Sequence, residues 1–172
     1  IARMTTAEHA ALLAQVSDLL AREGAALDEQ RYDDWLALFT EDCEYWVPAW
    51  KGDHTPTDNP QREVSLIYYS TRAGLEDRVW RIRSGQSVAS RPVPRTTHMV
   101  GSIRIEDASA DVVRVSASWH AFSFFHKTKA SEPFFGRYFY ELARVGDELR
   151  IRRKKIILMN DYIPTMLDVY NI

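Results

Sequence analysis

The side chains able to carry redox or acid–base chemistry are few in this chain. It has one cysteine, Cys43, and five histidines in 172 residues. An iron–sulfur cluster takes four thiolates, or two thiolates with two imidazoles in the Rieske type. One cysteine supplies neither set and cannot form an internal disulfide. We therefore expect no catalytic, cofactor-binding or metal-binding residue in this chain.

Two of the histidines offer an alternative. His98 and His120 fall on strands that we expect to be neighbours, so their side chains could converge near Asp33 or Tyr45. A His, an Asp and a Tyr in one pocket could act as general acid and base in a cofactor-free lyase or isomerase. The competing interpretation is a hydrogen-bonded histidine in the core or at an interface. We favour the second, because no motif supports a metal or an active site.

Composition narrows the function classes. The chain has 22 basic and 24 acidic residues, a net charge of −2, and a sequence pI near 6.2. This balance gives no electrostatic reason to expect a nucleic-acid partner. No apolar run approaches the roughly 20 residues that span a bilayer, so we expect no membrane partner. Residues 1–6 lack the pattern of a secretory signal, and a lone thiol fits a reducing compartment, so we expect a cytoplasmic protein.

Helical periodicity dominates the first half. Thr5 and Glu8 have the spacing of a capping box, and the residues after them form one apolar stripe. A second, short helix is expected to begin at Asp33 or Asp34, capped by a carboxylate. A third is expected over Thr71–Arg83, with Gly85 just beyond its end. The stripe of the first helix comprises Leu12, Leu13, Val16, Leu19, Leu20 and Leu27.

The remaining segments suggest loops and strands. We expect a turn at Thr40–Asp42, a strand at Cys43–Pro48, and loops at residues 49–63 and 91–94, which are rich in glycine, proline and polar residues. From Arg95 the period changes to two, which is typical of strands. The expected strands are Arg95–Glu106, Asp111–Lys127, Glu132–Val145 and Glu148–Asn160. Helices followed by long antiparallel strands indicate an α+β class, in which a curved sheet forms a cone around the first helix.

The last strand departs from simple alternation at Arg152–Lys155, a run of four basic residues before four apolar ones. A β-bulge would explain the slip, and so would burial of both faces in an assembly. Strict alternation would place Arg152 and Lys154 on one face and the other two on the opposite face. Four charges are too few for nucleic-acid binding, so we expect a solvated or ion-paired face, or one that meets carboxylates of a neighbouring subunit.

Two apolar features indicate an oligomer. The strands after residue 118 carry more aromatic side chains than one face of a small sheet can bury, and an exposed patch of this size marks a contact between subunits. The residues concerned include Phe122 and Phe124 on one strand and Phe134, Tyr138 and Tyr140 on the next. Residues 161–172 are also too apolar for a free terminus, so they must dock on their own domain or across an interface.

Four stretches together resemble the small (β) subunit of aromatic-ring-hydroxylating dioxygenases. They are Tyr32–Pro48 (YDDWLALFTEDCEYWVP), Leu66–Arg83 (LIYYSTRAGLEDRVWRIR), Arg95–Ser102 (RTTHMVGS) and Lys154–Ile172 (KKIILMNDYIPTMLDVYNI). The last is most similar to the benzoate- and anthranilate-type members. The resemblance extends over nearly the whole chain and implies a single domain over residues 1–172 with a cystatin-like or NTF2-like fold.

The resemblance also implies a function. The chain would be the non-catalytic, structural small subunit of an NADH-dependent oxygenase for a benzoate-like aromatic carboxylate, in aromatic catabolism. A large (α) subunit would carry the Rieske [2Fe–2S] centre and a mononuclear non-heme iron. The assembly would contain three large and three small subunits, with homotrimer contacts between the small subunits. The lyase or isomerase that uses His98, His120, Asp33 and Tyr45 remains the alternative.

Overall fold

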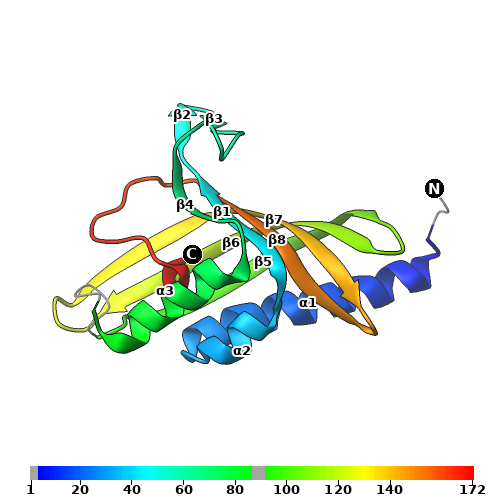
Figure 1. Ribbon diagram of the computed structural model, residues 1–172, viewed down its shortest axis with the longest axis horizontal. Coiled ribbons are helices and arrows are strands. Elements are labelled where there is room, and N and C mark those ends of the chain that lie inside the picture. Colours follow the sequence, from blue (N-terminus) through cyan, green and yellow to red (C-terminus); the bar gives the residue numbers. More distant parts are fainter. Residues whose placement is uncertain (1–3, 87–91) are drawn as a thin grey trace.

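A long, curved sheet wraps around the first helix in the computed structural model, which describes residues 4–86 and 92–172 (Figure 1). The strand order is β4-β1-β8-β7-β6-β5. Neighbouring strands are antiparallel except β1 and β8, which pair in parallel. The strands are β1 (Phe39–Pro48), β4 (Ser65–Tyr69), β5 (Arg95–Ala108), β6 (Val112–Phe125), β7 (Ala130–Val145) and β8 (Glu148–Leu158). The predicted α+β cone is confirmed. Strands β1 and β8 are far apart in the sequence and no hairpin joins them, which allows their parallel pairing.

Helix α1 (Thr6–Asp28) begins as the sequence predicts. The Glu8 amide donates to Thr5 Oγ1 at 3.2 Å, and the Thr5 amide donates to the Glu8 carboxylate at 2.7 Å, which completes the capping box. The predicted stripe faces the sheet, with Leu13 only half-buried. We call the sheet face that packs on α1 the inner face and the opposite one the outer face. The inner face and α1 enclose the cone interior.

Helix α2 (Tyr32–Ala37) and the start of β1 correct two predictions. No side chain caps α2, which begins before Asp33; Asp33 instead accepts from Arg83 and Asp34 from Arg31. The predicted turn at Thr40–Asp42 is wrong, because this segment belongs to β1. Phe39 already pairs with Ile151, whose amide donates to the Leu38 carbonyl at 2.8 Å, and this distant partner sets the strand boundary.

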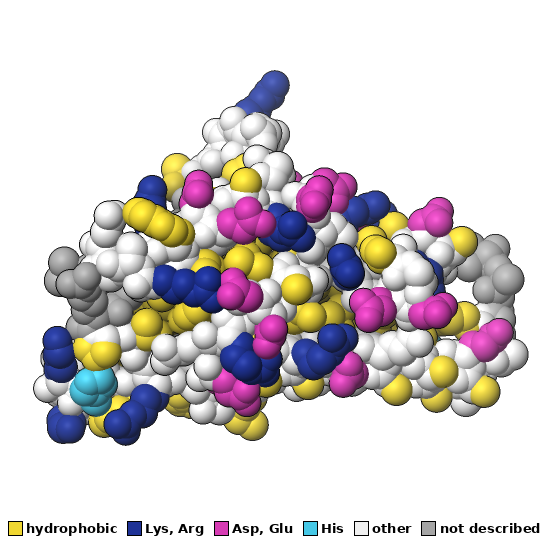
Figure 2. All heavy atoms as spheres, turned by 60° about the horizontal axis from the view of Figure 1, so that its bottom comes forward, with side chains coloured by type: hydrophobic (Ala, Val, Ile, Leu, Met, Phe, Trp, Pro, Cys, Tyr) yellow, Lys and Arg dark blue, Asp and Glu magenta, His cyan; other side chains and the backbone are white. Residues whose placement is uncertain are grey.

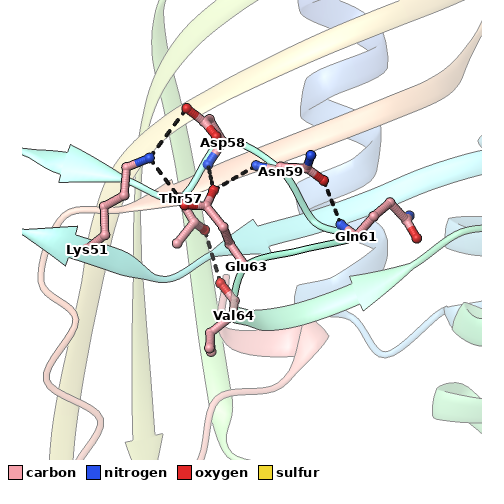
Figure 3. Close-up of polar contacts among 7 residues, drawn as sticks. All are labelled: Lys51, Thr57, Asp58, Asn59, Gln61, Glu63 and Val64. Atoms are coloured by element: carbon pink, nitrogen blue, oxygen red, sulfur yellow. Dashed lines mark hydrogen bonds and ion pairs between the residues drawn. The ribbon is translucent and has the colours of Figure 1, made fainter.

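The segment predicted as a loop over residues 49–63 contains a small hairpin, β2 (Trp50–Gly52) and β3 (Thr55–Pro56), and strand β4 after it was not predicted. This arm, residues 49–64, stands away from the sheet (Figure 1). Figure 3 shows the hydrogen bonds that Glu63 makes within the arm. Its carboxylate accepts from the amides of Asp58 and Asn59 at 2.7 and 2.9 Å and from Lys51 at 3.2 Å. These bonds lower the pKa of Glu63 to about 2.

Later elements follow the sequence closely. Helix α3 (Arg72–Ser84) has Thr71 at its start and Gly85 at its end, with φ of +65°, the left-handed conformation that suits glycine. All four strands from Arg95 are confirmed to within a few residues. Of the predicted loop at 91–94, Arg91 lies outside the described residues, and residues 92–94 are irregular.

The predicted irregularity of the last strand is a β-bulge at Arg152. Glu141 pairs with Arg153 whereas Leu142 pairs with Ile151, so one residue of β8 has no partner on β7. The simple alternation of the basic run is therefore wrong. Lys154 alone turns to the inner face and is buried, while Arg152, Arg153 and Lys155 lie on the outer face.

The end of the chain docks on its own domain. A one-turn 3-10 helix, η2 (Val169–Asn171), is buried against β5 and β6. Its preceding residue, Asp168, is fully buried and accepts two bonds from Arg78 of α3, at 2.8 and 2.5 Å. Of the two alternatives for the end of the chain, residues 168–172 therefore dock on their own domain. Tyr162, in the segment before them, is 78% exposed and does not.

Candidate functional site

The four residues of the predicted acid–base site do not converge. His98 and His120 lie on neighbouring strands, but His98 pairs with Ala121 and Met99 pairs with His120, which places the two imidazoles on opposite faces of the sheet. His120 is exposed, with Nε2 3.1 Å from the Met99 sulfur. The two histidines occupy positions that differ by one residue in the pairing of β5 with β6, so the sheet lies between their side chains.

The other two members are also apart from His98. Asp33 is on the surface and pairs with Arg83 at 2.9 Å. Tyr45 is completely buried among aromatic rings, with the Trp35 centroid at 6.3 Å and the Phe39 centroid at 6.4 Å. Burial raises the pKa of the Tyr45 hydroxyl well above its usual value. The geometry therefore does not form the predicted lyase site.

His98 has a partner that the sequence did not predict. Its Nδ1 lies 2.6 Å from Asp28 Oδ1, and its amide donates to Asp28 Oδ2 at 2.9 Å. Thr96 Oγ1 also donates to Asp28, at 2.9 Å. Burial alone would raise the pKa of Asp28, but the bonds from His98 and Thr96 outweigh it and hold the pKa below its usual value. The three bonds fasten the last residue of α1 to β5.

A second polar cluster lies deeper in the cone interior. Lys154 Nζ donates to Glu23 Oε1 at 2.6 Å, and Tyr140 donates its hydroxyl to Glu23 Oε2 at 2.8 Å. Both charged side chains are almost completely buried. The ammonium also lies 4.1 Å from the centroid of the Tyr138 ring, a cation–π contact. We call Glu23, Tyr138, Tyr140 and Lys154 the interior cluster.

The interior cluster is recognisable in the sequence only in retrospect. Glu23 falls on the apolar stripe of α1, seven residues after Val16 and four before Leu27. A carboxylate at such a position needs a buried cation or donor. Lys154 supplies it, but the bulge that turns Lys154 inward depends on pairing between β7 and β8. Likewise, Asp28 could be matched to His98 only once the register of β5 against α1 was known.

The donor set does not fit an iron–sulfur centre. Cys43 is fully buried, and burial raises the pKa of its thiol to about 11, which disfavours the thiolate that ligates iron. Across residues 4–86 and 92–172, no three His, Cys, Asp or Glu side chains are grouped so that they could hold a metal ion. In the same residues, no helix is both long and apolar enough to cross a bilayer.

The outer face has a different character from the interior. Five large apolar side chains on it are between 39% and 55% exposed. They are Met99, Phe122, Phe135, Phe139 and Met159. The predicted exposed aromatic patch is therefore present, with a correction to its members. Phe122 belongs to it, but Phe134, Tyr138 and Tyr140 point inward, because the register of β7 exposes Phe135 and Phe139.

The side of the molecule that bears the helices carries many charged side chains among its apolar ones (Figure 2). Figure 2 shows Lys and Arg side chains interspersed with Asp and Glu over the side that bears α1 and α2. Several of these charges form ion pairs, for example Arg22 with Asp18 at 2.9 Å and Arg31 with Asp34 at 2.6 Å. Such exposed pairs contribute little stability and keep this side well solvated.

The fold is an α+β domain in which a curved sheet wraps around one helix. The family model described as "Ring hydroxylating beta subunit" matches residues 22–165. The chain belongs to this family, the small subunits of multicomponent ring-hydroxylating dioxygenases. The resemblance noted in the sequence is thereby confirmed.

Individual relatives agree over nearly their whole length. The chain is 39% identical to the benzoate 1,2-dioxygenase subunit beta of Acinetobacter baylyi, with 92% of each chain covered. It is 38% identical to the 2-halobenzoate 1,2-dioxygenase small subunit of Burkholderia cepacia, with 98% of this chain and 100% of the relative covered. These similarities favour the dioxygenase-subunit interpretation over the lyase alternative.

Solved structures support the fold. The beta subunit of benzoate 1,2-dioxygenase from Burkholderia mallei superposes with a TM-score of 0.77 at 32% identity, covering both chains completely. A hexachlorocyclohexane dehydrochlorinase has a TM-score of 0.62 at 16% identity, with 88% of this chain and 86% of that one covered, and it shares the fold alone. The predicted NTF2-like fold is confirmed.

Proposed function

We propose that this chain is the structural subunit of an oxygenase for a benzoate-like aromatic carboxylate, and that it contributes no catalytic residue. In this proposal a large subunit holds a Rieske [2Fe–2S] centre and a mononuclear iron, and three large and three small subunits assemble in the cytoplasm. The substrate class rests on similarity to the benzoate and 2-halobenzoate subunits. The absence of a catalytic role rests on the cone interior.

The observation that carries the proposal is how the interior is filled. Trp35, Tyr45 and Tyr138 are each no more than 2% exposed, and the Glu23–Lys154 pair lies between the helix and the rings. Substrate binding requires a concave pocket with a few free polar groups. In the interior cluster the Glu23 carboxylate and the Lys154 ammonium pair with each other, and this ion pair holds α1 to the sheet.

Reconstitution of the oxygenase tests this function. The chain and a large subunit, co-expressed, should purify as one complex that hydroxylates an aromatic acid when supplied with NADH and a reductase. His98→Ala and His120→Ala should each leave kcat within about twofold, because neither side chain touches substrate in this account. A loss of 100-fold or more in kcat for His98→Ala, in a complex that still assembles, would return the acid–base alternative.

A further inference from the structure

A groove of about 460 Å³ follows the line where α1 packs on β5, the strand at one edge of the sheet (Figure 1). Leu20, Ala21 and Ala25 line it from α1, and Val100 and Ile103 line it from β5. Small-molecule sites have volumes of about 300–1,000 Å³ and mostly apolar walls with a few polar groups. The groove therefore has the size and the walls to accept one small ring.

A β-bulge in β5 shapes one wall of this groove. Between Gly101 and Arg104, β5 has one residue more than the stretch of β6 that pairs with it. Ser102, inside the bulge, has φ of +51°, a left-handed conformation that is uncommon for residues other than glycine. Strict alternation would place Val100 and Ile103 on opposite faces of the sheet, and the extra residue lets both line the groove.

His98 brings an unused polar atom to this groove. It is one of the lining residues, and its side chain is only 2% exposed. Its Nδ1 is 2.6 Å from Asp28, whereas its Nε2 is buried and has no hydrogen-bond partner among the described residues. Gly24 of α1 lies against His98, where a Cβ would be 3.2 Å from the His98 Cβ, so no side chain of this residue covers the histidine. A buried polar atom without a partner is rare and calls for a ligand.

Asp28 determines what His98 Nε2 can bind. Burial, which raises the pKa of Asp28, is outweighed by the hydrogen bonds from His98 and Thr96, so the carboxyl group is ionised at neutral pH and only accepts. His98 Nδ1 therefore carries the hydrogen of the bond to Asp28, and in the neutral imidazole Nε2 is left as an acceptor. A ligand for this atom must donate a hydrogen bond, and it should carry no negative charge, because Asp28 would repel it.

We propose that the groove between α1 and β5 binds a small neutral aromatic molecule with a hydroxyl group, of which phenol is the simplest example. The ring lies between the apolar side chains of α1 and β5, and the hydroxyl donates to His98 Nε2. Ser17 adds a hydroxyl to the lining, which can meet a second polar substituent of the ligand. Such binding involves no reaction and does not depend on the function proposed above.

The groove distinguishes among three molecules of similar size. Phenol places its ring between the apolar walls and satisfies His98 Nε2. Anisole, its methyl ether, has the same ring but no donor, so the buried acceptor stays unpaired. Benzoate brings a carboxylate close to the ionised Asp28, and like charges repel more strongly in a partly buried site than in water. Phenol should therefore bind more tightly than either of the others.

Titration of the isotope-labelled full-length chain with phenol, anisole and benzoate, followed by NMR, tests the proposal. Phenol should shift the amide signals of the lining residues and the nitrogen resonance of His98 Nε2, which reports a hydrogen bond to that atom. Anisole and benzoate should each bind about tenfold more weakly. His98→Asn keeps a donor to Asp28 in the place of Nδ1 but removes Nε2. This variant should bind phenol about tenfold more weakly and anisole as the wild-type chain does.

A second pair of variants tests the walls of the groove. Ala21→Leu adds a larger side chain to the lining from an exposed position of α1, and it should weaken phenol binding on the order of tenfold. Ala14→Leu is the matched control, because Ala14 is exposed on the same helix but does not line the groove, and it should have no effect. Circular dichroism and thermal unfolding establish that the variants fold.

Each outcome decides the proposal. No phenol binding at millimolar concentration, equal affinities for phenol and anisole, or an unchanged phenol affinity in His98→Asn would overturn it. Should His98→Asn fail to fold, the comparison of phenol with anisole on the wild-type chain and the effect of Ala21→Leu still decide it. These measurements use the chain alone, so their failure is distinct from a failure of the oxygenase reconstitution.

Discussion

Lys154 and Lys155 are adjacent in the sequence and lie on opposite faces of one strand. Lys154 is 1% exposed and donates to Glu23 at 2.6 Å in the cone interior. Lys155 lies over Trp46 on the outer face and has no carboxylate partner among the described residues. The lysine on the inner face thus forms a buried ion pair, whereas its neighbour on the outer face forms none among the described residues.

The largest effect should come from removing the inward lysine. Lys154→Ala leaves the Glu23 carboxylate buried without its cation, which costs about 3–5 kcal/mol in free energy of unfolding. Lys155→Ala, the matched control one residue later, should cost less than about 1 kcal/mol. Urea denaturation followed by circular dichroism measures both. Equal losses for the two variants would remove the distinction between the faces.

A double variant sharpens the same comparison. Glu23→Leu combined with Lys154→Met replaces both charges with apolar groups of similar size, and it should recover about 2 kcal/mol or more relative to Lys154→Ala. The Tyr140 hydroxyl loses its acceptor in this background, so adding Tyr140→Phe should recover about 1 kcal/mol further. If the double variant were no more stable than the single one, the cost would lie in lost packing and not in an unpaired charge.

The docked end of the chain provides the next effect. Arg78→Leu leaves Asp168 buried without its guanidinium, although the Val169 amide still donates to that carboxylate at 2.7 Å. We expect a loss of about 2–3 kcal/mol, less than at Lys154 because Arg78 is partly exposed. Limited proteolysis should then cut within residues 161–172 faster than in the wild-type chain. An unchanged cleavage rate would mean that apolar contacts alone hold this segment.

A smaller effect concerns acid stability at Asp28. The folded-state pKa of Asp28 is depressed, so its contribution is present above the unfolded-state pKa of about 3.9 and is lost as the pH falls through the lower folded-state pKa. Asp28→Asn should therefore cost about 1–2 kcal/mol at pH 7 and should flatten the decline below about pH 4. Thermal unfolding across this range measures it. Parallel pH profiles for the two proteins would contradict this linkage.

The smallest global effect is expected in the arm. The folded-state pKa of Glu63 is about 2, so its bonds to the Asp58 and Asn59 amides persist above its unfolded-state pKa and disappear as the pH falls toward 2. Glu63→Ala removes the acceptor and should leave global stability nearly unchanged but raise hydrogen exchange at those two amides. Exchange indistinguishable from wild type would show that the β2–β3 pairing orders the arm without Glu63.

Features of the fold that depend on neighbouring residues could be predicted from the sequence, whereas those that depend on distant residues could not. The cap of α1, the end of α3 at Gly85 and the alternation in β6 depend on nearby residues, and all were confirmed. The start of β1 at Phe39 depends on Ile151, more than a hundred residues away, and was missed. The polar clusters follow the same rule. The Glu23–Lys154 pair was not predicted, because Lys154 turns inward only through a bulge set by the pairing of β7 with β8.

The central claim is that this subunit supplies architecture while the redox metals belong to its partner. Iron analysis of the chain purified without a large subunit, beside the complex of the two, tests it most directly. The account predicts a colourless small subunit with no bound iron, and iron in the complex that stays with the large subunit when the two are separated. Stoichiometric iron in the small subunit purified alone would contradict it.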